Sequence, residues 1–357
     1  MKIIRLGTYK TGFTYYKVKS KGTGKGKCEA KVEITDSREI EKIKELKIPP
    51  AYENVTILNN KKIIAYGYDT KNRKQVLYHP SFVATQNIKK YNKISASIKF
   101  FSKLKKKVSD DLNGNGNGSN GNQKTMAIAV IITLILSCGF RIGNKKYEKD
   151  NNSVGLTTLK YKHLTFKDNK VIIDFIGKKG VRNVAECDNK RIYDYLYHKH
   201  ATAMSNASDI KDINETYIFN YEGGEGGEGN ERSERSERSE GSEANKVISS
   251  SDVNEYLRVI SDPYSIIITT KDLRTWNANM LFLTYYRKLQ KLRKRTSKRR
   301  EASGAEAAVA VAKTAKEVEK DIKKAIEMVA EKLHNSYSIC KKSYIDPKII
   351  DELLLKN

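Results

Sequence analysis

The stretch MAIAVIITLILSCGFRIGNKKYEK, residues 126–149, passes from the most apolar run of the chain into a strongly basic segment. The apolar run, 126–136, has 11 residues without a charged side chain, so it is predicted to form a buried core helix. It is too short to span a membrane, which takes about 20 apolar residues. Arg141 follows at the point where buried structure meets a cationic turn.

The composition of the whole chain points to a polyanionic partner. Its 357 residues contain 68 Lys and Arg against 42 Asp and Glu, a formal net charge of +26. Because charge of one sign repels itself in a compact state, nucleic acid is the expected partner. No signal peptide or lipidation motif is found, so an intracellular, cytoplasmic protein without membrane association is expected. The 4 cysteines form no CxxC pair, which predicts neither disulfides nor a metal site.

The N-terminal residues 1–84 are predicted to form a small, basic, mostly antiparallel β domain. Their segments are rich in β-branched and aromatic residues and are separated by Gly, Asn or Asp turns. One helix is expected at 37–48, where Pro49 and Pro50 end it. Strands are expected at 2–9, 13–20, 28–35, 54–60, 61–70 and 74–80.

The remainder, 85–357, is predicted to be a larger, mainly α-helical domain with a small β-sheet, which makes the fold class α+β. Strands are expected at 162–168 and 170–177, with a third at 181–187. The composition changes between 80 and 92, so a hinge is expected there. Helices are expected around 92–112, 125–138, 190–206, 250–260, 271–294 and 301–334.

Three segments have the composition of insertions. Residues 113–123 (NGNGNGSNGNQ) are predicted to be a flexible polar loop. Residues 222–244 place Glu at every third position with almost nothing apolar to bury, so disorder is expected. Residues 301–334 consist of strong helix formers, which predicts a long helix that delivers the C-terminal tail from a distance.

Three basic segments and a tyrosine are candidates for phosphate chemistry. The segments are FRIGNKKYEK (140–149), GKKG (177–180) and KDLRTW (271–276), the last preceded by Thr269 or Thr270 as a helix cap. Taken singly, each such segment is more often a solvated basic face. Tyr344 lies in CKKSYIDP near the C-terminus, and a phenol with its usual pKa of about 10 needs a cationic surround to act as a nucleophile.

Six segments, spread over nearly the whole chain, occur in the order of a known family's motifs. They are KIPPAYENVTI (47–57), GYDTKNRKQVLYHP (67–80), CGFRIGNKKYEKDNNSVGLTTLKYKHL (138–164), FIGKKGV (175–181), KDLRTWNANMLFL (271–283) and NSYSICKKSYIDP (335–347). This set resembles the poxvirus-type DNA topoisomerase IB family of poxviruses, mimiviruses and some bacteria. The resemblance implies a fold shared with tyrosine recombinases.

The resemblance also implies a catalytic set. Tyr344 would attack a DNA phosphodiester and form a 3′-phosphotyrosyl bond, which conserves the bond energy, so no ATP, metal or other cofactor is needed. Arg141 and Arg274 would hold the nonbridging oxygens, and Lys178 would protonate the leaving 5′ oxygen. Asn335 occupies the place, 9 residues before the tyrosine, where poxvirus enzymes carry a histidine. A shift of one residue would present His334 instead.

The implied partner is supercoiled double-stranded DNA, around which a monomer would clamp. Gln75 is the candidate reader of a base edge in the major groove. Val76 stands where the poxvirus enzymes carry one tyrosine of a DNA-contacting pair. The candidate backbone contacts are Arg73, Lys74, Tyr78, Lys146, Tyr147 and Lys271. The basic run 287–300 is a DNA-tracking face or a nuclear signal, and the virus factory or virion is the implied location for a viral member.

Two other classes of protein share some of these features. Tyrosine recombinases have the same two arginines, lysine and tyrosine, but usually carry His-x-x-Arg where this chain has KDLR, and their N-terminal domain is helical. A non-enzymatic basic DNA-binding protein would explain the charge alone. It would form no covalent adduct with DNA.

Overall fold

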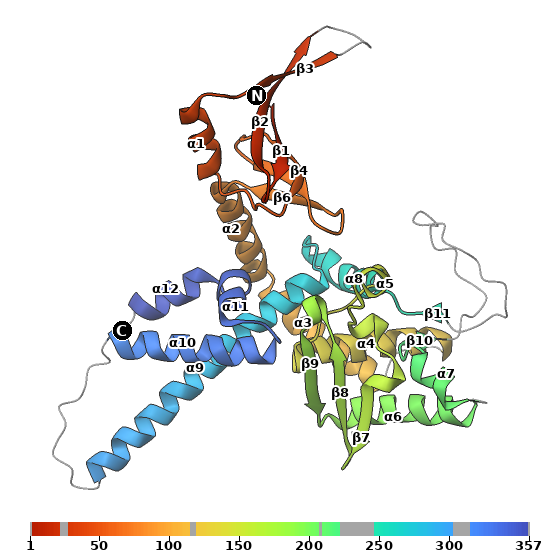
Figure 1. Cartoon of the computed structure of the whole chain (residues 1–357). Coiled ribbons are helices and arrows are strands. Elements are labelled where there is room, and N and C mark those ends of the chain that lie inside the picture. The colour runs from red at the N-terminus through yellow and green to blue at the C-terminus, as the bar shows by residue number, and fades with distance from the viewer. Residues whose placement is uncertain are drawn as a thin grey trace. The chain divides into compact units, whose positions relative to one another are not determined.

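The computed structural model describes residues 2–21, 28–114, 119–206, 209–221, 246–302 and 315–355 (Figure 1). Its contacts divide the chain into two compact units, Met1–Asn92 and Lys93–Asn357. The predicted insertion 222–244 lies outside the described residues. None of the helices in the described ranges is apolar over a length that would span a membrane.

The first unit contains a six-stranded antiparallel sheet, as predicted. The strand order is β3-β2-β1-β4-β5-β6, and helix α1 (Ser37–Glu45) lies between β3 and β4 in the chain. Val55 and Ile57 on β4 are buried in its core together with Ile43 on α1. The strands are β1 (Lys2–Thr8), β2 (Gly12–Lys21), β3 (Cys28–Glu33), β4 (Glu53–Ile57), β5 (Ile63–Tyr68) and β6 (Lys74–Tyr78).

A buried arginine holds the loop between α1 and β4. Arg5 on β1 is 4% exposed and donates to the carbonyl oxygens of Tyr52 at 2.6 Å and Pro49 at 3.0 Å. Its guanidinium lies 4.2 Å from the centroid of the Phe13 ring. The KIPPAYENV motif is therefore tied to the sheet by side-chain contacts that its local sequence does not reveal.

The second unit is mainly helical, also as predicted, and is built around helix α4 (Ser119–Cys138). From Ala127 to Ile132 the α4 side chains are at most 3% exposed. The helix contacts α3 (Ile98–Leu112), α8 (Ser250–Ser261), α9 (Thr270–Ala302) and strand β9. The three-stranded sheet, β7 (Leu164–Lys167), β8 (Lys170–Ile176) and β9 (Arg182–Cys187), packs through β8 against α6 (Lys190–Ser205).

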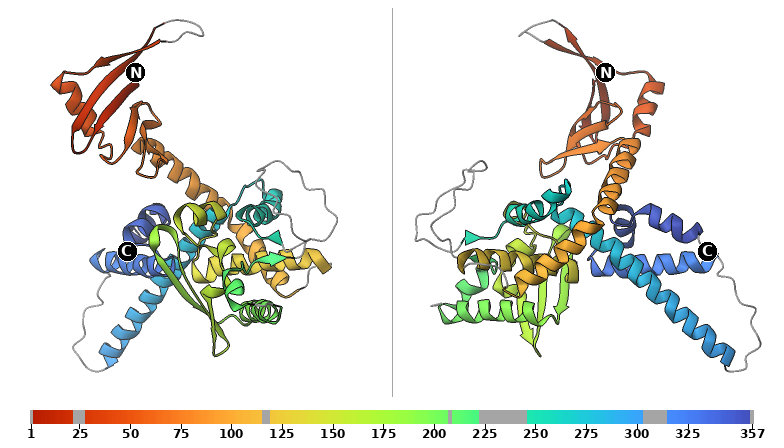
Figure 2. Two further views of the ribbon diagram at one scale, coloured as in Figure 1. Left: turned by 45° about the vertical axis from the view of Figure 1, so that its right-hand side comes forward. Right: turned by 180° about the vertical axis from the view of Figure 1, so that it is seen from behind.

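The C-terminal helices lie together in this unit (Figure 2). Their buried side chains form a second hydrophobic cluster. Helices α9 and α10 (Ala315–Lys332) pack against each other through residues such as Phe282 and Ile326. Arg293 on α9 pairs with Glu317 on α10 at 3.3 Å, so the chain reverses direction between these helices. Residues 303–314 of the predicted helix 301–334 lie outside the described residues. Helices α11 (Tyr337–Ser343) and α12 (Pro347–Leu355) follow.

Several local predictions need correction. Ser119–Gln123 were predicted to belong to a polar loop, but α4 begins at Ser119; residues 115–118 are not described. The segment 80–92, expected to be a hinge, belongs to helix α2 (Pro80–Ala96), and the division into two units falls at its end, after Asn92. Helix α9 continues past the expected end at 294 to Ala302. Four short elements were not predicted, because they are too short to show periodicity: α5 (Lys145–Asn151), α7 (Ile210–Glu215), β10 (Asn220–Tyr221) and β11 (Lys246–Val247).

Candidate active site

The first turns of α9 place Arg274 in the core of the second unit. Thr269 caps the helix: its hydroxyl donates to Asp272 Oδ2 at 2.7 Å and accepts from the Asp272 backbone N–H. Lys93 pairs with the same carboxylate oxygen at 2.7 Å. Trp276 stacks on Phe101 with ring centroids 4.2 Å apart. The cap and the stacking set the direction in which Arg274 points.

Arg274 joins three segments that are distant in sequence. Its side chain is almost fully buried, and its two terminal nitrogens donate to the backbone carbonyls of Gly139 and Leu333. Its Nε lies 3.4 Å from the Tyr344 hydroxyl. Burial, together with the positive charge of Arg141, lowers the pKa of Arg274 to about 10, so the guanidinium stays charged at neutral pH.

Gly139 is needed where α4 turns toward Arg141. Its φ is +69°, and a Cβ there would lie 2.2 Å from the carbonyl oxygen of Lys332 at the end of α10. Any other residue would therefore be strained and would push α10 away. The close approach brings the ends of α4 and α10 together, and with them Arg141 and Asn335.

Arg141 contacts Asn335 rather than His334. Arg141 Nη2 donates to Asn335 Oδ1 at 2.7 Å. The buried Nδ2 of Asn335 has no hydrogen-bond partner within the described part of the chain. His334 instead lies with Nε2 3.1 Å from the carbonyl oxygen of Cys138, and its ring stacks on Phe140. Asn335, rather than His334, is thus the residue that Arg141 contacts.

Tyr344 follows α11 and is held in place by Asn279. The Asn279 amide donates to the carbonyl of Tyr344 at 2.8 Å and accepts from the backbone N–H of Asp346 at 2.8 Å. Ile345 between them is fully buried. Asn279 was not predicted to be a site residue; its signal in the sequence was a polar residue inside the apolar segment ANMLFL of α9.

The two arginines change the acidity of the Tyr344 phenol. Burial alone would raise its pKa, but the positive charges of Arg274 and Arg141, and their hydrogen bonds to the hydroxyl, outweigh burial and lower the pKa. The Arg274 guanidinium also lies 5.4 Å from the centroid of the ring. This is the cationic surround that a nucleophilic phenol requires.

Lys178 lies outside this cluster, on the exposed turn between β8 and β9. No hydrogen bond or ion pair joins it to the other four residues among those described. The turn closes through a bond from Gly177 N–H to the carbonyl of Val181 at 2.8 Å, and a Cβ on Gly177 would lie 2.5 Å from Asn183 Nδ2. The preceding Ile176 carbonyl accepts from Val154 N–H at 3.0 Å, which ties β8 to the segment that follows Arg141.

The candidate DNA contacts lie on exposed surfaces of both units. In the second unit Lys146 and Tyr147 are exposed on α5, and Lys271 is exposed in the first turn of α9. In the first unit Tyr78 is exposed and stacks on Phe82 with ring centroids 5.4 Å apart.

The candidate base reader on β6 is already oriented by a carboxylate. Asp69 Oδ2 accepts from Gln75 Nε2 at 3.0 Å and from Arg73 Nε at 2.9 Å. The bonds from Arg73 lower the pKa of Asp69 to about 2, so the acceptor is ionised at neutral pH. The neighbouring Lys74 ammonium lies 4.2 Å from the centroid of the Tyr66 ring.

Comparisons with known proteins identify the family of the chain. A family model of the catalytic core of eukaryotic DNA topoisomerase I matches residues 72–345, and a model of the N-terminal domain of bacterial DNA topoisomerase IB matches residues 29–69. The DNA topoisomerase 1B of Acanthamoeba polyphaga mimivirus is 27% identical over 315 residues, which cover 88% of this chain and 79% of that protein. The vaccinia virus (strain Copenhagen) DNA topoisomerase 1B is 29% identical over 160 residues, or 41% of this chain and 47% of that protein. Because the core model spans most of the sequence, the chain belongs to the type IB DNA topoisomerase family.

Proposed function

We propose that this type IB topoisomerase cleaves one strand of duplex DNA by attack of the Tyr344 hydroxyl on a phosphodiester. The bond from Oη to phosphorus forms as the bond from phosphorus to the 5′ oxygen breaks, which leaves a 3′-phosphotyrosyl linkage and a free 5′ hydroxyl. The observation that carries the proposal is the phenol of Tyr344, 3.4 Å from Arg274 Nε, with its pKa lowered by Arg274 and Arg141.

The arginines and Asn335 are proposed to bind the nonbridging phosphate oxygens. A guanidinium has five N–H donors, and within the described residues Arg274 uses three of them, one on each nitrogen. One N–H on each terminal nitrogen is then available to a phosphate. The buried Nδ2 of Asn335 also lacks a partner in the described ranges, and a phosphate oxygen would satisfy it. These donors are held in place before DNA binds, so they can stabilise the charge of the transition state.

Lys178 is proposed to be the general acid. Its ammonium would give a proton to the departing 5′ oxygen, and the phenolic proton of Tyr344 would pass to solvent water as the phosphotyrosyl bond forms. Religation is the reverse: the 5′ hydroxyl attacks phosphorus and the tyrosine is released. Because the bond energy is kept in the linkage, the cycle consumes no nucleotide, and rotation of the free strand relaxes supercoils.

The substrate is proposed to be supercoiled duplex DNA, around which a monomer clamps. In the first unit Gln75 would read a base edge, and Arg73, Lys74 and Tyr78 would contact the backbone. In the second unit Lys146, Tyr147 and Lys271 would contact phosphates.

Plasmid relaxation in EDTA without nucleotide tests the proposed function. Supercoiled plasmid should relax, and stopping the reaction with a denaturant should trap the protein on the 3′ side of the nick. Relaxation that requires magnesium or ATP would overturn the mechanism. A requirement for paired specific sites in the plasmid would indicate a recombinase instead.

The Lys178→Ala variant is expected to cleave normal DNA about 100-fold or more slowly, in the range usual for loss of a general acid. A substrate with sulfur in the scissile 5′-bridging position should be cleaved at nearly the normal rate, because a thiolate leaves without protonation. Single-turnover cleavage of the two substrates measures this. The variant Lys179→Ala, at the next position in the same exposed turn, is the control. Equal defects on both substrates would remove Lys178 as the acid.

A further inference from the structure

Helix α5 is held by a carboxylate that has no part in the proposed mechanism. The helix has 7 residues, and an isolated helix of fewer than about 12 residues is marginal in water, so its orientation depends on tertiary contacts. Lys146 and Tyr147 are exposed on it. The next residue, Glu148, has a side chain that is only 17% exposed.

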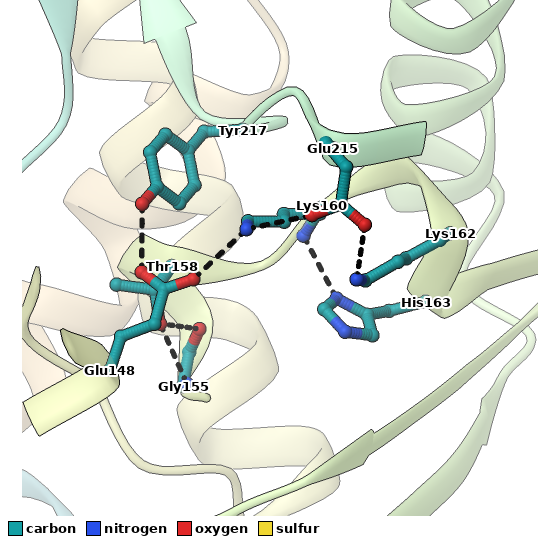
Figure 3. Close-up of polar contacts among 8 residues, drawn as sticks. All are labelled: Glu148, Gly155, Thr158, Lys160, Lys162, His163, Glu215 and Tyr217. Atoms are coloured by element: carbon teal, nitrogen blue, oxygen red, sulfur yellow. Dashed lines mark hydrogen bonds and ion pairs between the residues drawn. The ribbon is translucent and has the colours of Figure 1, made fainter. Parts of the chain in front are cut away.

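Glu148 contacts two side chains from other parts of the chain (Figure 3). Its Oε2 accepts from the Tyr217 hydroxyl at 2.8 Å, and its Oε1 lies 3.2 Å from Lys160 Nζ. The same ammonium lies 3.0 Å from Glu215, which also pairs with Lys162. Glu215 is 57% exposed, and its ion pairs among the described residues are with these two lysines.

The two partners of Glu148 are themselves fixed by backbone pairing. Lys160 and Tyr217 form an antiparallel β-bridge. On one side of it Ile218 N–H donates to the Leu159 carbonyl at 3.0 Å, and on the other Tyr161 N–H donates to the Thr216 carbonyl at 3.3 Å. α5 is therefore attached to a rigid pair of segments.

The negative charge of Glu148 by itself disfavours DNA binding. The residue is therefore expected to have another role that offsets this cost. A carboxylate beside phosphate contacts repels the phosphates, and it sits here next to two exposed candidate contacts. Burial and the bond to Glu148 raise the pKa of Tyr217 to about 12, so its phenol remains a neutral donor. The ammonium of Lys160 offsets the negative charge locally. Both features suit a carboxylate that serves as an anchor.

We propose that Glu148 is a positioning residue for DNA binding, which orients α5 so that Lys146 and Tyr147 meet the DNA backbone. The inference rests on the proposed DNA contacts of these two residues. Glu148, Tyr217 and Lys160 then affect the affinity of the enzyme for duplex DNA indirectly, by holding α5.

The sign of the effect of Glu148→Gln tests the proposal. Removing a negative charge from a protein that binds a polyanion should strengthen binding if charge alone matters. Loss of positioning should instead weaken DNA binding by about tenfold. It should also make the negative slope of log K against log salt shallower by about one unit. Fluorescence anisotropy of labelled duplex DNA over a range of salt concentrations measures both quantities. In single-turnover cleavage, the half-saturating DNA concentration should rise, with a smaller effect on the rate at saturation.

Three further variants separate the possible explanations. Glu215→Gln removes the same charge from the outer side of Lys160 and should bind DNA as tightly as the wild type or more tightly. Tyr217→Phe changes no charge and should weaken binding in the same direction as Glu148→Gln. Glu148→Gln binding as tightly as Glu215→Gln would overturn the inference. Lys146→Ala should make the negative slope of log K against log salt shallower by about one unit. An unchanged slope in this variant would overturn the proposed role of α5 itself.

Discussion

The Tyr344→Phe variant is expected to bind duplex DNA with nearly the affinity of the wild type and to form no covalent adduct with it. The substitution removes the single oxygen that attacks phosphorus, and loss of a nucleophile typically costs on the order of 10⁴ to 10⁶ in rate. The phenyl ring can keep its packing against Arg274 and the C-terminal cluster. Thermal unfolding should therefore change little, which makes the loss specific to chemistry.

Adduct formation on a suicide substrate, resolved by denaturing gel electrophoresis, measures the Tyr344→Phe prediction. Tyr337→Phe is a matched control, because Tyr337 lies on α11, packs against the same cluster and is 7 residues before the proposed nucleophile. This control should form the adduct at the wild-type level. An adduct from Tyr344→Phe itself would assign the nucleophile to another residue.

The Arg274→Ala variant is expected to lose both activity and stability. Loss of an arginine that stabilises a phosphoryl transition state costs on the order of 10³ to 10⁵ in rate. The carbonyls of Gly139 and Leu333 also lose their buried donor, at a cost of about 1–3 kcal/mol for each group left unsatisfied. Single-turnover cleavage well below the melting temperature, together with thermal unfolding, measures the two effects separately.

The Arg274→Lys variant separates charge from geometry. An ammonium keeps the charge but cannot reach Gly139, Leu333 and Tyr344 at once, as the planar guanidinium does. Cleavage should still fall by about 100-fold or more, in proportion to the lost transition-state contacts. Arg258→Lys is the control, because Arg258 is an arginine on the surface of α8 that pairs with Glu255. Wild-type cleavage by Arg274→Lys would contradict the proposed phosphate contacts.

Residues with a local signature were predictable from the sequence. The β-branched and aromatic segments in 2–80, separated by Gly, Asn or Asp turns, indicated the antiparallel sheet, and the uncharged run 126–136 indicated the buried part of α4. A helix cap was predicted at Thr269 or Thr270 from the sequence position alone, and the structure shows that it is Thr269. The start of α4 was missed because its first residues, Ser119–Asn122, include Asn and Gly, which have low helix propensity. The start of α2 was missed because Pro80 was assigned to the end of a strand.

The candidate site is a different case, because its members lie far apart in sequence. Tyr344, Arg274, Arg141 and Asn335 were named from ordered motifs, without any physical reason why they should meet. The structure supplies that reason: Arg274 bonds to the carbonyls of Gly139 and Leu333, next to Arg141 and Asn335 in the chain. Lys178 was named in the same way and is found on a separate, exposed turn.

The sequence by itself determined the sheet, most of the helices, the basic character and the identities of the candidate catalytic side chains. These follow from side-chain periodicity and motif order, which are local or one-dimensional properties. Only the tertiary structure decided that Asn335 rather than His334 faces Arg141, that Asn279 anchors Tyr344, and that Glu148 anchors α5. Each of these depends on a hydrogen bond between residues about 65 or more positions apart, and such bonds exist only once packing has brought the segments together.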